Sequence, residues 1–245
     1  MTTSPDDRPR TALVVVAHPD DAEFGCGATL AGWAQEGWEI TLVVCTDGGA
    51  GGADDATDVG SEARRRISGI RKEEQRAAAA ILGLKEVVFL DFPDGQLEPN
   101  LLLRREIVRQ IRRIRAYRLV CQSPDRAWTP SYMIGRFHPD HLAAATATLA
   151  ALYPAAQNGW DFPELLAEGF PPSRVRELYV TGAPHLNFAV DISATIELKL
   201  AALRCHVSQL GEDQTELAVR VRGWAVERGE PFGLPMAEAY HRVEN

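Results

Sequence analysis

The sequence contains little of what marks several large protein classes. Four cysteines stand far apart in 245 residues without a CxxC pair, which disfavours a disulfide framework and a thiolate-rich zinc site. No run of about 18 apolar residues occurs, so no transmembrane helix is predicted. The polar stretch 1–10 lacks the apolar core of a signal peptide, and the cytoplasm is the expected compartment.

Basic residues are also in deficit. Lys and Arg number 26 against 34 Asp and Glu, which gives a formal net charge of -8. Proteins bind phosphate-rich partners through clusters of Lys and Arg. We therefore expect neither nucleic acid nor a membrane as a partner, and we predict a small-molecule ligand.

Apolar residues are plentiful, at 45%, and they stand in short runs. Continuous β-branched runs such as LVVV are typical of strands that are buried on both faces of a parallel sheet. Segments with helical spacing separate these runs, which indicates βαβ units. We predict an α/β fold with a Rossmann-like, mostly parallel sheet flanked by helices. The expected strands are 13–17, 40–45, 87–90 and 119–122, and the expected helices are 25–37, 61–82 and 101–114.

The longest expected helix, 61–82, is amphipathic, and Gly83 is a suitable C-terminal stop. Many charges stand on one side of this helix. We expect the other side to carry its apolar residues Ile67, Ile70, Ala77, Ala78 and Ile81.

The C-terminal third is less regular. Four prolines within 153–174 predict a long surface excursion. We expect a flexible tail at 1–10 and a single domain over 11–245. Association into a homo-oligomer, with the C-terminal third as a plausible interface, stays open. The remaining expected elements are strands at 178–181 and 189–192 and helices at 194–210 and 215–228.

Polar motifs follow each of the first four expected strands. They read HPDD (18–21), TDGG (46–49), DFPDG (91–95) and, across a loop, HPDH (138–141). In open parallel sheets, ligands bind outside the carboxyl ends of the strands. All four of these ends carry carboxylates, and two also carry histidines, so a functional site is predicted at this edge.

A metal site can be built from two of these motifs. His18 and Asp21 are close across a turn that Pro19 helps to fix, and His141 arrives from a different strand end. Two nitrogens and one carboxylate form the ligand set of a hydrolytic zinc site, which keeps one position open for water. Zinc is the expected cofactor, although iron, cobalt or manganese would also suit these ligands.

The remaining groups of the two motifs suggest catalytic roles. Asp20 is placed to accept the proton of the attacking water. His138 would stabilise an oxyanion or protonate a leaving amine, and Asp140 would orient His138. His206, on the expected helix 194–210, is a weaker candidate.

Several of these segments also have a simpler or different interpretation. One HPD turn alone is often a surface turn, but two copies after two strands favour a site. Gly25-Cys26-Gly27 is a poor dinucleotide loop, because Leu30 stands where the third glycine belongs. In the loop 123–137, Trp128 and Tyr132 are candidate substrate contacts, with simple packing as the alternative for Trp128.

The run AHPDDAEFGCGATLA (17–31), together with HPDH (138–141), resembles the LmbE-like, PIG-L-type N-acetylglucosamine deacetylases. VVCTDGG, IRKEEQRAAAAILGL with VVFLDFPDG, and DISATIELKLAALRCHVSQ are similar to further segments of that family. The resemblance covers roughly residues 12–150 and 175–210. It departs from the common HPDDE pattern at Ala22.

The resemblance implies a Rossmann-like fold and a mononuclear zinc site. Arg71 matches a position that contacts sugar, and Asp94 is a candidate contact to the distal part of the substrate. The other matched positions agree with the roles inferred above: His18, Asp21 and His141 as metal ligands, Asp20 as general base, His138 as stabiliser of the tetrahedral intermediate, and Asp140 as its partner.

We therefore predict a zinc-dependent hydrolase that removes an acyl group, most simply acetyl, from an N-acyl amino sugar or a small N-acetylglucosaminyl conjugate. One rival is a metal-dependent amidase that acts on another amide, such as a thiol conjugate. Another rival is a non-catalytic protein that binds metal or sugar, but such a protein has no need of Asp20 and His138. A structural-metal module is disfavoured by the ligand types.

Overall fold

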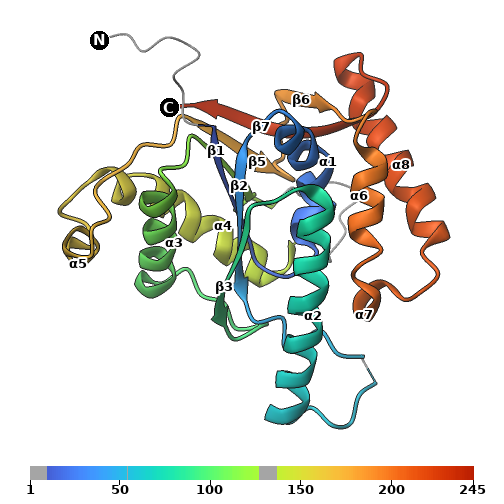
Figure 1. Cartoon of the computed structure of the whole chain (residues 1–245), viewed down its shortest axis with the longest axis horizontal. Helices are drawn as coiled ribbons and strands as arrows, with labels where there is room; N and C mark the ends of the chain where they lie inside the picture. The colour runs from blue at the N-terminus through green and yellow to red at the C-terminus, as the bar shows by residue number, and fades with distance from the viewer. Residues whose placement is uncertain (1–9, 54, 127–136) are drawn as a thin grey trace.

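The computed structural model describes residues 10–53, 55–126 and 137–245. Its sheet consists of β1 (Thr11–Val16), β2 (Glu39–Thr46), β3 (Glu86–Phe92), β4 (Arg118–Gln122), β5 (Glu177–Thr181), β6 (Phe188–Asp191) and β7 (Ala237–Glu244). The strand order is β3-β2-β1-β4-β5-β7-β6 (Figure 1). Strands β1 to β5 pair in parallel, and β7 pairs antiparallel with both β5 and β6. The predicted α/β fold with a mostly parallel sheet is confirmed.

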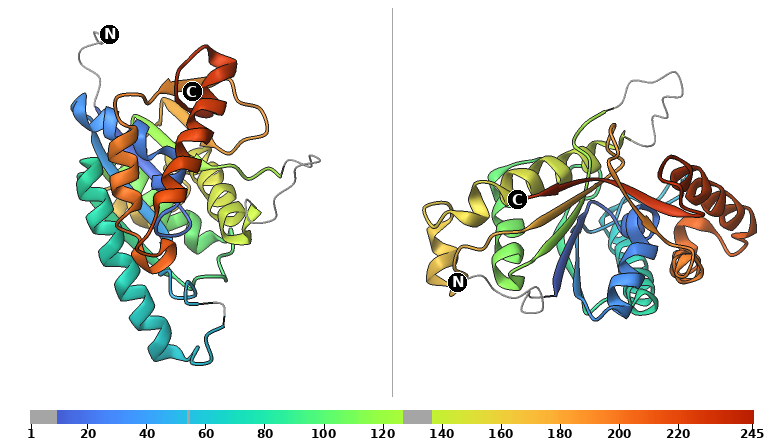
Figure 2. Two further views of the ribbon diagram at one scale, coloured as in Figure 1. Left: turned by 90° about the vertical axis from the view of Figure 1, so that its right-hand side faces the viewer. Right: turned by 90° about the horizontal axis from the view of Figure 1, so that it is seen from above.

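Helices cover both faces of the sheet. They are α1 (Asp21–Gln35), α2 (Ser61–Leu82), α3 (Leu101–Ile114), α4 (Pro139–Leu152), α5 (Pro163–Ala167), α6 (Ile196–Leu203), α7 (Val207–Leu210) and α8 (Thr215–Gly229), with short 3-10 turns η3 (Ala155–Gln157) and η4 (Glu230–Phe232). Seen from above, α3 and α4 lie on one side, and α1, α2, α6 and α8 lie on the other (Figure 2).

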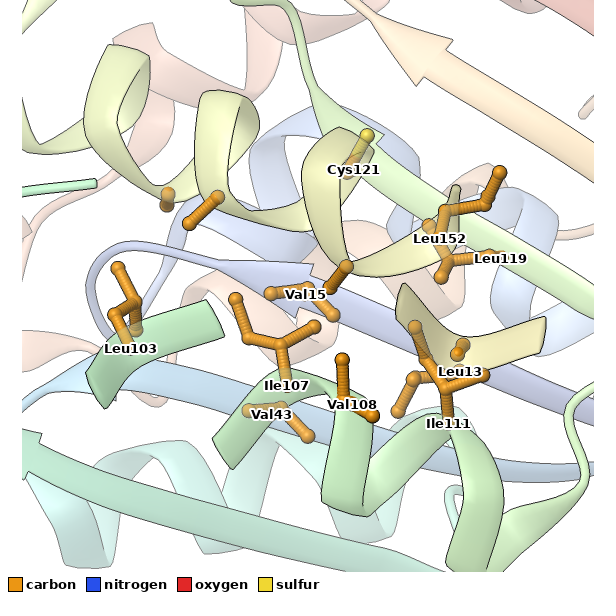
Figure 3. Close-up of a cluster of buried hydrophobic side chains, with 14 of the residues drawn as sticks. Leu13, Val15, Val43, Leu103, Ile107, Val108, Ile111, Leu119, Cys121 and Leu152 are labelled. Carbon is orange, nitrogen blue, oxygen red and sulfur yellow. The ribbon is translucent and has the colours of Figure 1, made fainter. Parts of the chain in front are cut away.

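The two faces explain why β1 is apolar throughout. Leu13 and Val15 pack with α3 and α4 in one cluster, part of which is drawn in Figure 3. Val14 and Val16 point to the other face and pack with α1. Because successive side chains of a strand alternate between faces, a strand covered on both sides must be apolar at every position.

Local signals set the ends of two helices at the predicted residues. Gly83, with φ 75°, ends α2 in the left-handed conformation that glycine adopts without strain. The Asn100 side chain accepts the Leu103 backbone N–H at 3.0 Å and caps α3.

The expected apolar face of α2 was wrong in part. Ile70 and Ile81 are 47% and 37% exposed. The buried positions of α2 include Arg71 and Gln75 instead, since these polar side chains hydrogen-bond to loops at the sheet edge. A polar stripe of this kind cannot be recognised from hydrophobic periodicity.

The second half of the chain departs from prediction at three places. The helix expected at 194–210 breaks between α6 and α7, because His206 has a non-helical ψ of 55° and is fully buried. Helix α4 and strand β7 were not predicted. In β7 the buried Glu238 interrupts the apolar pattern, and it is tolerated there because Lys199 lies 2.6 Å away.

The segment 153–174 is partly a core element and not only a surface excursion. Leu165 of α5 is fully buried in the cluster that contains α3. Arg112 of α3 donates from Nη2 to the carbonyls of Ala155, Asn158 and Asp161. A buried guanidinium that satisfies several carbonyls fixes a backbone that has few ladder hydrogen bonds of its own.

Candidate metal centre and active site

The two HPD motifs meet where the strand order reverses. The chain runs from β1 outward to β2 and β3, and then returns to the other side of β1 with β4. His18 follows β1, and His138 to His141 open α4 after β4. A crevice at the carboxyl ends of such a pair of strands is the usual ligand position in open α/β sheets.

Asp20 begins α1 in an unusual backbone conformation. Its φ of 89° lies in the left-handed region, which costs a non-glycine residue about 1–2 kcal/mol. Two side chains of α2 stabilise this turn. Gln75 Oε1 accepts the Asp20 backbone N–H at 2.9 Å, and Arg71 Nη2 donates to the Pro19 carbonyl at 3.0 Å.

The three predicted metal ligands present atoms at metal-site spacing. His18 Nδ1 lies 3.2 Å from His141 Nε2 and 3.5 Å from Asp21 Oδ2, and His141 Nε2 lies 3.0 Å from Asp21 Oδ1. Zinc bonds to nitrogen and carboxylate oxygen measure about 2.0–2.2 Å, so tetrahedral ligand atoms stand about 3.3–3.6 Å apart. The ligand set therefore fits a divalent cation.

His18 is held by carboxylates on its other ring nitrogen. Its Nε2 lies 3.1 Å from Asp140 Oδ2 and 3.2 Å from Asp94 Oδ1. A carboxylate behind a histidine fixes the tautomer and the ring orientation, and it leaves the opposite nitrogen free for a metal. Asp140 is itself fixed, because its oxygens accept the backbone N–H groups of Gly95 and Leu97.

This contact corrects the expected partner of Asp140. The Asp140 carboxylate contacts His18, whereas its backbone N–H donates to His138 Nδ1 at 3.2 Å. His138 is thus the N-cap of α4. Because Nδ1 accepts, the neutral His138 ring carries its proton on Nε2. Burial and the neighbouring His18 lower the pKa of His138, which favours this neutral form.

The cluster strongly favours positive charge at His18. Burial opposes the charged imidazole, but hydrogen bonds to Asp140, Asp21 and Asp94 raise the pKa of His18 to about 11. For Asp21, burial opposes ionisation, but His141 and His18 hold its pKa well below the usual range. The same negative field favours a divalent cation.

Asp20 has the opposite electrostatic character. Its burial and the adjacent Asp21 carboxylate raise the pKa of Asp20 to about 7, against the opposing charges of Arg71 and His206. The nearest of these charges is Arg71, whose Nη2 lies 3.6 Å from Asp20 Oδ2. A carboxyl group with a pKa near neutrality both accepts and returns a proton at physiological pH.

Arg71 and Asp94 lie inside the site as supports. Both are about 95% buried, and Arg71 Nη1 lies 3.5 Å from Asp94 Oδ2. Arg71 also donates to the Gly48 carbonyl, and Asp94 accepts the Ala50 backbone N–H at 2.9 Å. With these partners, the two side chains fix the loop after β2, and the substrate contacts expected for them stay predictions.

Gln75 and Glu23 are buried polar residues that were not predicted as part of the site, and they link Asp20 to His206, the weaker candidate of the sequence analysis. Gln75 Nε2 donates to Glu23 Oε1 at 2.8 Å, and Glu23 Oε2 lies 3.4 Å from His206 Nε2. Glu23 and His206 are both fully buried. The only available signal was the presence of polar residues within helical segments, which the exposed face of a helix also contains.

A cavity of about 640 Å³ opens beside the ligand cluster. Asp21 and His141 line it, and so do Phe24, Lys199 and Trp224. None of the described lining residues comes from 153–174. Trp128 and Tyr132, the expected substrate contacts, lie outside the described residues.

The cysteines behave as predicted. All four are free, and Cys26, Cys45 and Cys121 are buried among apolar side chains.

Among the residues that the structure describes, no helix is both long and apolar enough to cross a bilayer.

Comparison with known proteins identifies relatives with deacetylase names. Diacetylchitobiose deacetylase of Thermococcus kodakarensis is 33% identical over 210 residues, which cover 85% of this chain and 73% of that protein. The 1D-myo-inositol 2-acetamido-2-deoxy-alpha-D-glucopyranoside deacetylase of Nocardioides sp. is 27% identical, with 82% and 83% covered.

A solved structure agrees with these relatives. N,N'-diacetylchitobiose deacetylase from Pyrococcus horikoshii, in complex with an inhibitor, superposes with a TM-score of 0.85 at 25% identity, over 98% of this chain and 86% of that one. Residues 13–152, which contain both HPD motifs, match the family described as PIG-L, GlcNAc-PI de-N-acetylase. This match spans more than half of the sequence, and the chain belongs to the PIG-L family of deacetylases.

Proposed function

We propose that this protein is a zinc-dependent N-deacetylase of N-acetylglucosamine joined to a second group. The observation that carries the proposal is the convergence of His18 Nδ1, His141 Nε2 and the two carboxylate oxygens of Asp21, at 3.0–3.5 Å between the side chains, beside the raised-pKa carboxyl of Asp20. The names of two relatives support the substrate class, because each describes an acetylated glucosamine linked to a second ring.

His18, Asp21 and His141 would hold the metal ion. A divalent cation at these ligands would polarise the amide carbonyl and lower the pKa of water. The ionised Asp20 accepts a proton from the water that attacks the amide carbon. Since its pKa is about 7, Asp20 can then return that proton to the departing amine.

His138 stabilises the charge that develops on the amide oxygen. Its Nδ1 accepts the Asp140 backbone N–H, so Nε2–H is the ring group that would donate to this oxygen. The ring centroid of His138 lies 4.7 Å from that of His18 and 5.4 Å from that of His141. A donor fixed by a helix N-cap needs no reorganisation when negative charge appears.

The test is a metal assay coupled to amine release. We expect the purified protein to contain one equivalent of zinc and to release amine and acetate from N-acetylglucosamine and its β-1,4-linked disaccharide. A chelator should abolish turnover, and added zinc should restore it. Circular dichroism of the chelated protein would control for unfolding. Full turnover by the chelated, folded protein would refute the metal-dependent mechanism.

The rival functions give different results in the same assay. An amidase of another class would release amine from thiol-conjugate amides and leave the acetylated sugars intact. A binding protein would retain metal and sugar without turnover.

The cytoplasmic location, the homo-oligomer and the division into a tail over 1–10 and one domain over 11–245 stay predictions. Light scattering of the purified protein would measure the oligomeric state.

A further inference from the structure

The cavity at the ligand cluster extends well beyond the groups that would hold an N-acetyl sugar. Its volume of about 640 Å³ lies in the middle of the range of about 300–1,000 Å³ that accommodates drug-sized ligands. Asp21 and His141 line one part of it, and the other part is lined by α8. A monosaccharide is smaller than a drug-sized ligand and would leave this second part empty.

One face of α8 forms the wall of that second part. Val221, Trp224, Ala225 and Arg228 line the cavity at a spacing of three or four residues. At 1.5 Å per residue, the wall runs for about 10 Å along the helix. In Figure 1, α8 lies beside α6, on the side of the sheet that also holds α1.

The buried charges of the cavity are already paired. Lys199 Nζ donates to Glu238 Oε1 at 2.6 Å and to the Phe24 carbonyl at 2.8 Å. Glu238 Oε2 accepts the backbone N–H of Thr29 at 2.8 Å. Because these groups satisfy one another, they form a rigid base that joins α1, α6 and β7. The α8 wall adds further lining side chains outside this base.

Trp224 is the large apolar side chain that this wall presents. It is 47% exposed even though it lines a cavity, so its ring has apolar surface left to bury. The Glu227 carboxylate lies on the same wall and is exposed. An aromatic face beside a carboxylate suits a pyranose ring, whose C–H groups cover the aromatic face while its hydroxyls donate to oxygen.

We propose that Trp224 forms a second sugar subsite, on which the non-reacting pyranose ring of a disaccharide or similar two-ring conjugate stacks. This inference rests on the proposed deacetylase function and names the part of the substrate that the α8 wall binds. Stacking of the remote ring on Trp224 would provide binding energy that helps to hold the acetamido group at the ligand cluster.

The experiment compares the two substrate lengths in matched variants. Trp224→Ala should raise KM for the β-1,4-linked N-acetylglucosamine disaccharide about threefold to tenfold more than KM for the monosaccharide. Trp224→Phe should recover most of this difference. Trp160→Ala is the control, because Trp160 is 92% exposed and does not line the cavity.

A binding measurement separates the subsite from the chemistry. Calorimetric titration of the Asp20→Asn protein should show that the disaccharide binds more tightly than the monosaccharide, and that Trp224→Ala removes this advantage. If the wild-type protein deacetylates neither sugar but this binding difference persists, the proposed function fails and the subsite stands.

Three results would overturn the subsite. The first is an equal effect of Trp224→Ala on both sugars, in turnover and in binding. The second is no effect on either sugar while the wild-type protein deacetylates both. The third is a selective loss with N-butanoylglucosamine over N-acetylglucosamine, which would assign the α8 wall to an acyl chain.

Discussion

Gln75 on α2 holds Asp20 in its left-handed conformation, through a hydrogen bond of 2.9 Å from the Asp20 backbone N–H to Gln75 Oε1. The orientation of the Gln75 side-chain amide is fixed, because its Nε2 donates to Glu23 and a flip of the amide would break this hydrogen bond. The proposed general base is therefore positioned by a residue that touches no reacting atom.

Replacing Gln75 by Met should lower kcat about fivefold to a hundredfold, since a buried N–H would lose a partner worth about 1–3 kcal/mol. Zinc content should stay at the wild-type level, because no ligand is changed. Gln35→Met, an exposed change on α1, is the matched control. Wild-type kcat in a folded Gln75→Met protein would show that this contact does not position Asp20.

A residue that would bind the metal directly and a residue that supports a ligand should differ in their effect on metal affinity. Asp140→Asn weakens the support behind His18 Nε2 and should reduce zinc affinity about 10–100-fold. His141→Ala removes a ligand atom and should reduce zinc affinity more than Asp140→Asn does. Competition with a chelating dye would measure both affinities. An unchanged affinity in His141→Ala would exclude His141 as a ligand.

His138→Ala should separate catalysis from metal binding. Removal of one oxyanion donor costs about 2.7–4 kcal/mol, so kcat should fall by roughly 10²–10³ while zinc stays bound. His185→Ala, an exposed histidine outside the cluster, serves as the control. Loss of zinc from the His138→Ala protein would mean that His138 is a ligand and not a donor.

Acid should destabilise the sheet through Glu177 of β5. Burial opposes ionisation of Glu177, but hydrogen bonds from Tyr179 and Arg118 and the charge of Arg242 lower its pKa below the ordinary 4.5. A carboxyl group whose pKa is lowered by folding stabilises the folded state above its unfolded pKa. That stability is lost as the pH falls through the folded pKa.

Glu177→Gln should therefore lower Tm by about 3–10 °C at pH 7, because hydrogen bonds to a charged group are lost. The difference in Tm from the wild-type protein should shrink as the pH falls below the ordinary pKa of 4.5 and through the lowered pKa of the folded state. Glu168→Gln alters an exposed ion pair with Arg109 and should change Tm little. A difference in Tm that is independent of pH would contradict the assignment to the Glu177 charge.

The strand-end motifs were predictable because a parallel sheet brings its carboxyl ends to one edge. The continuous apolar run LVVV of β1 predicts a strand that is covered on both faces, and the HPDD motif follows that strand directly in the sequence. The strand order itself was not predicted, and it is the pairing of β4 with β1 that brings His141 to His18. The sequence thus indicated the edge of the sheet where these groups meet, and the structure adds which strands are neighbours there.

Buried polar contacts were not predictable in the same way. The hydrophobic periodicity of the helix places Arg71 and Gln75 outside its apolar face, yet both side chains are buried against the site. Glu238 makes β7 hard to recognise as a buried strand, because the charge of Glu238 is neutralised by Lys199, which stands 39 residues earlier. Each of these positions depends on a partner that is distant in sequence, and local periodicity contains no information about that partner.

The place of β7 in the sheet limits when β6 can find a partner strand. In the described part of the chain, β6 pairs with β7 only, and β7 in turn fills the position beside β5. During synthesis on the ribosome, β6 therefore has no strand to join until residues 237–244 have emerged. Glu238 arrives with them, so the Lys199 ammonium has no Glu238 carboxylate to pair with until β7 has been synthesised.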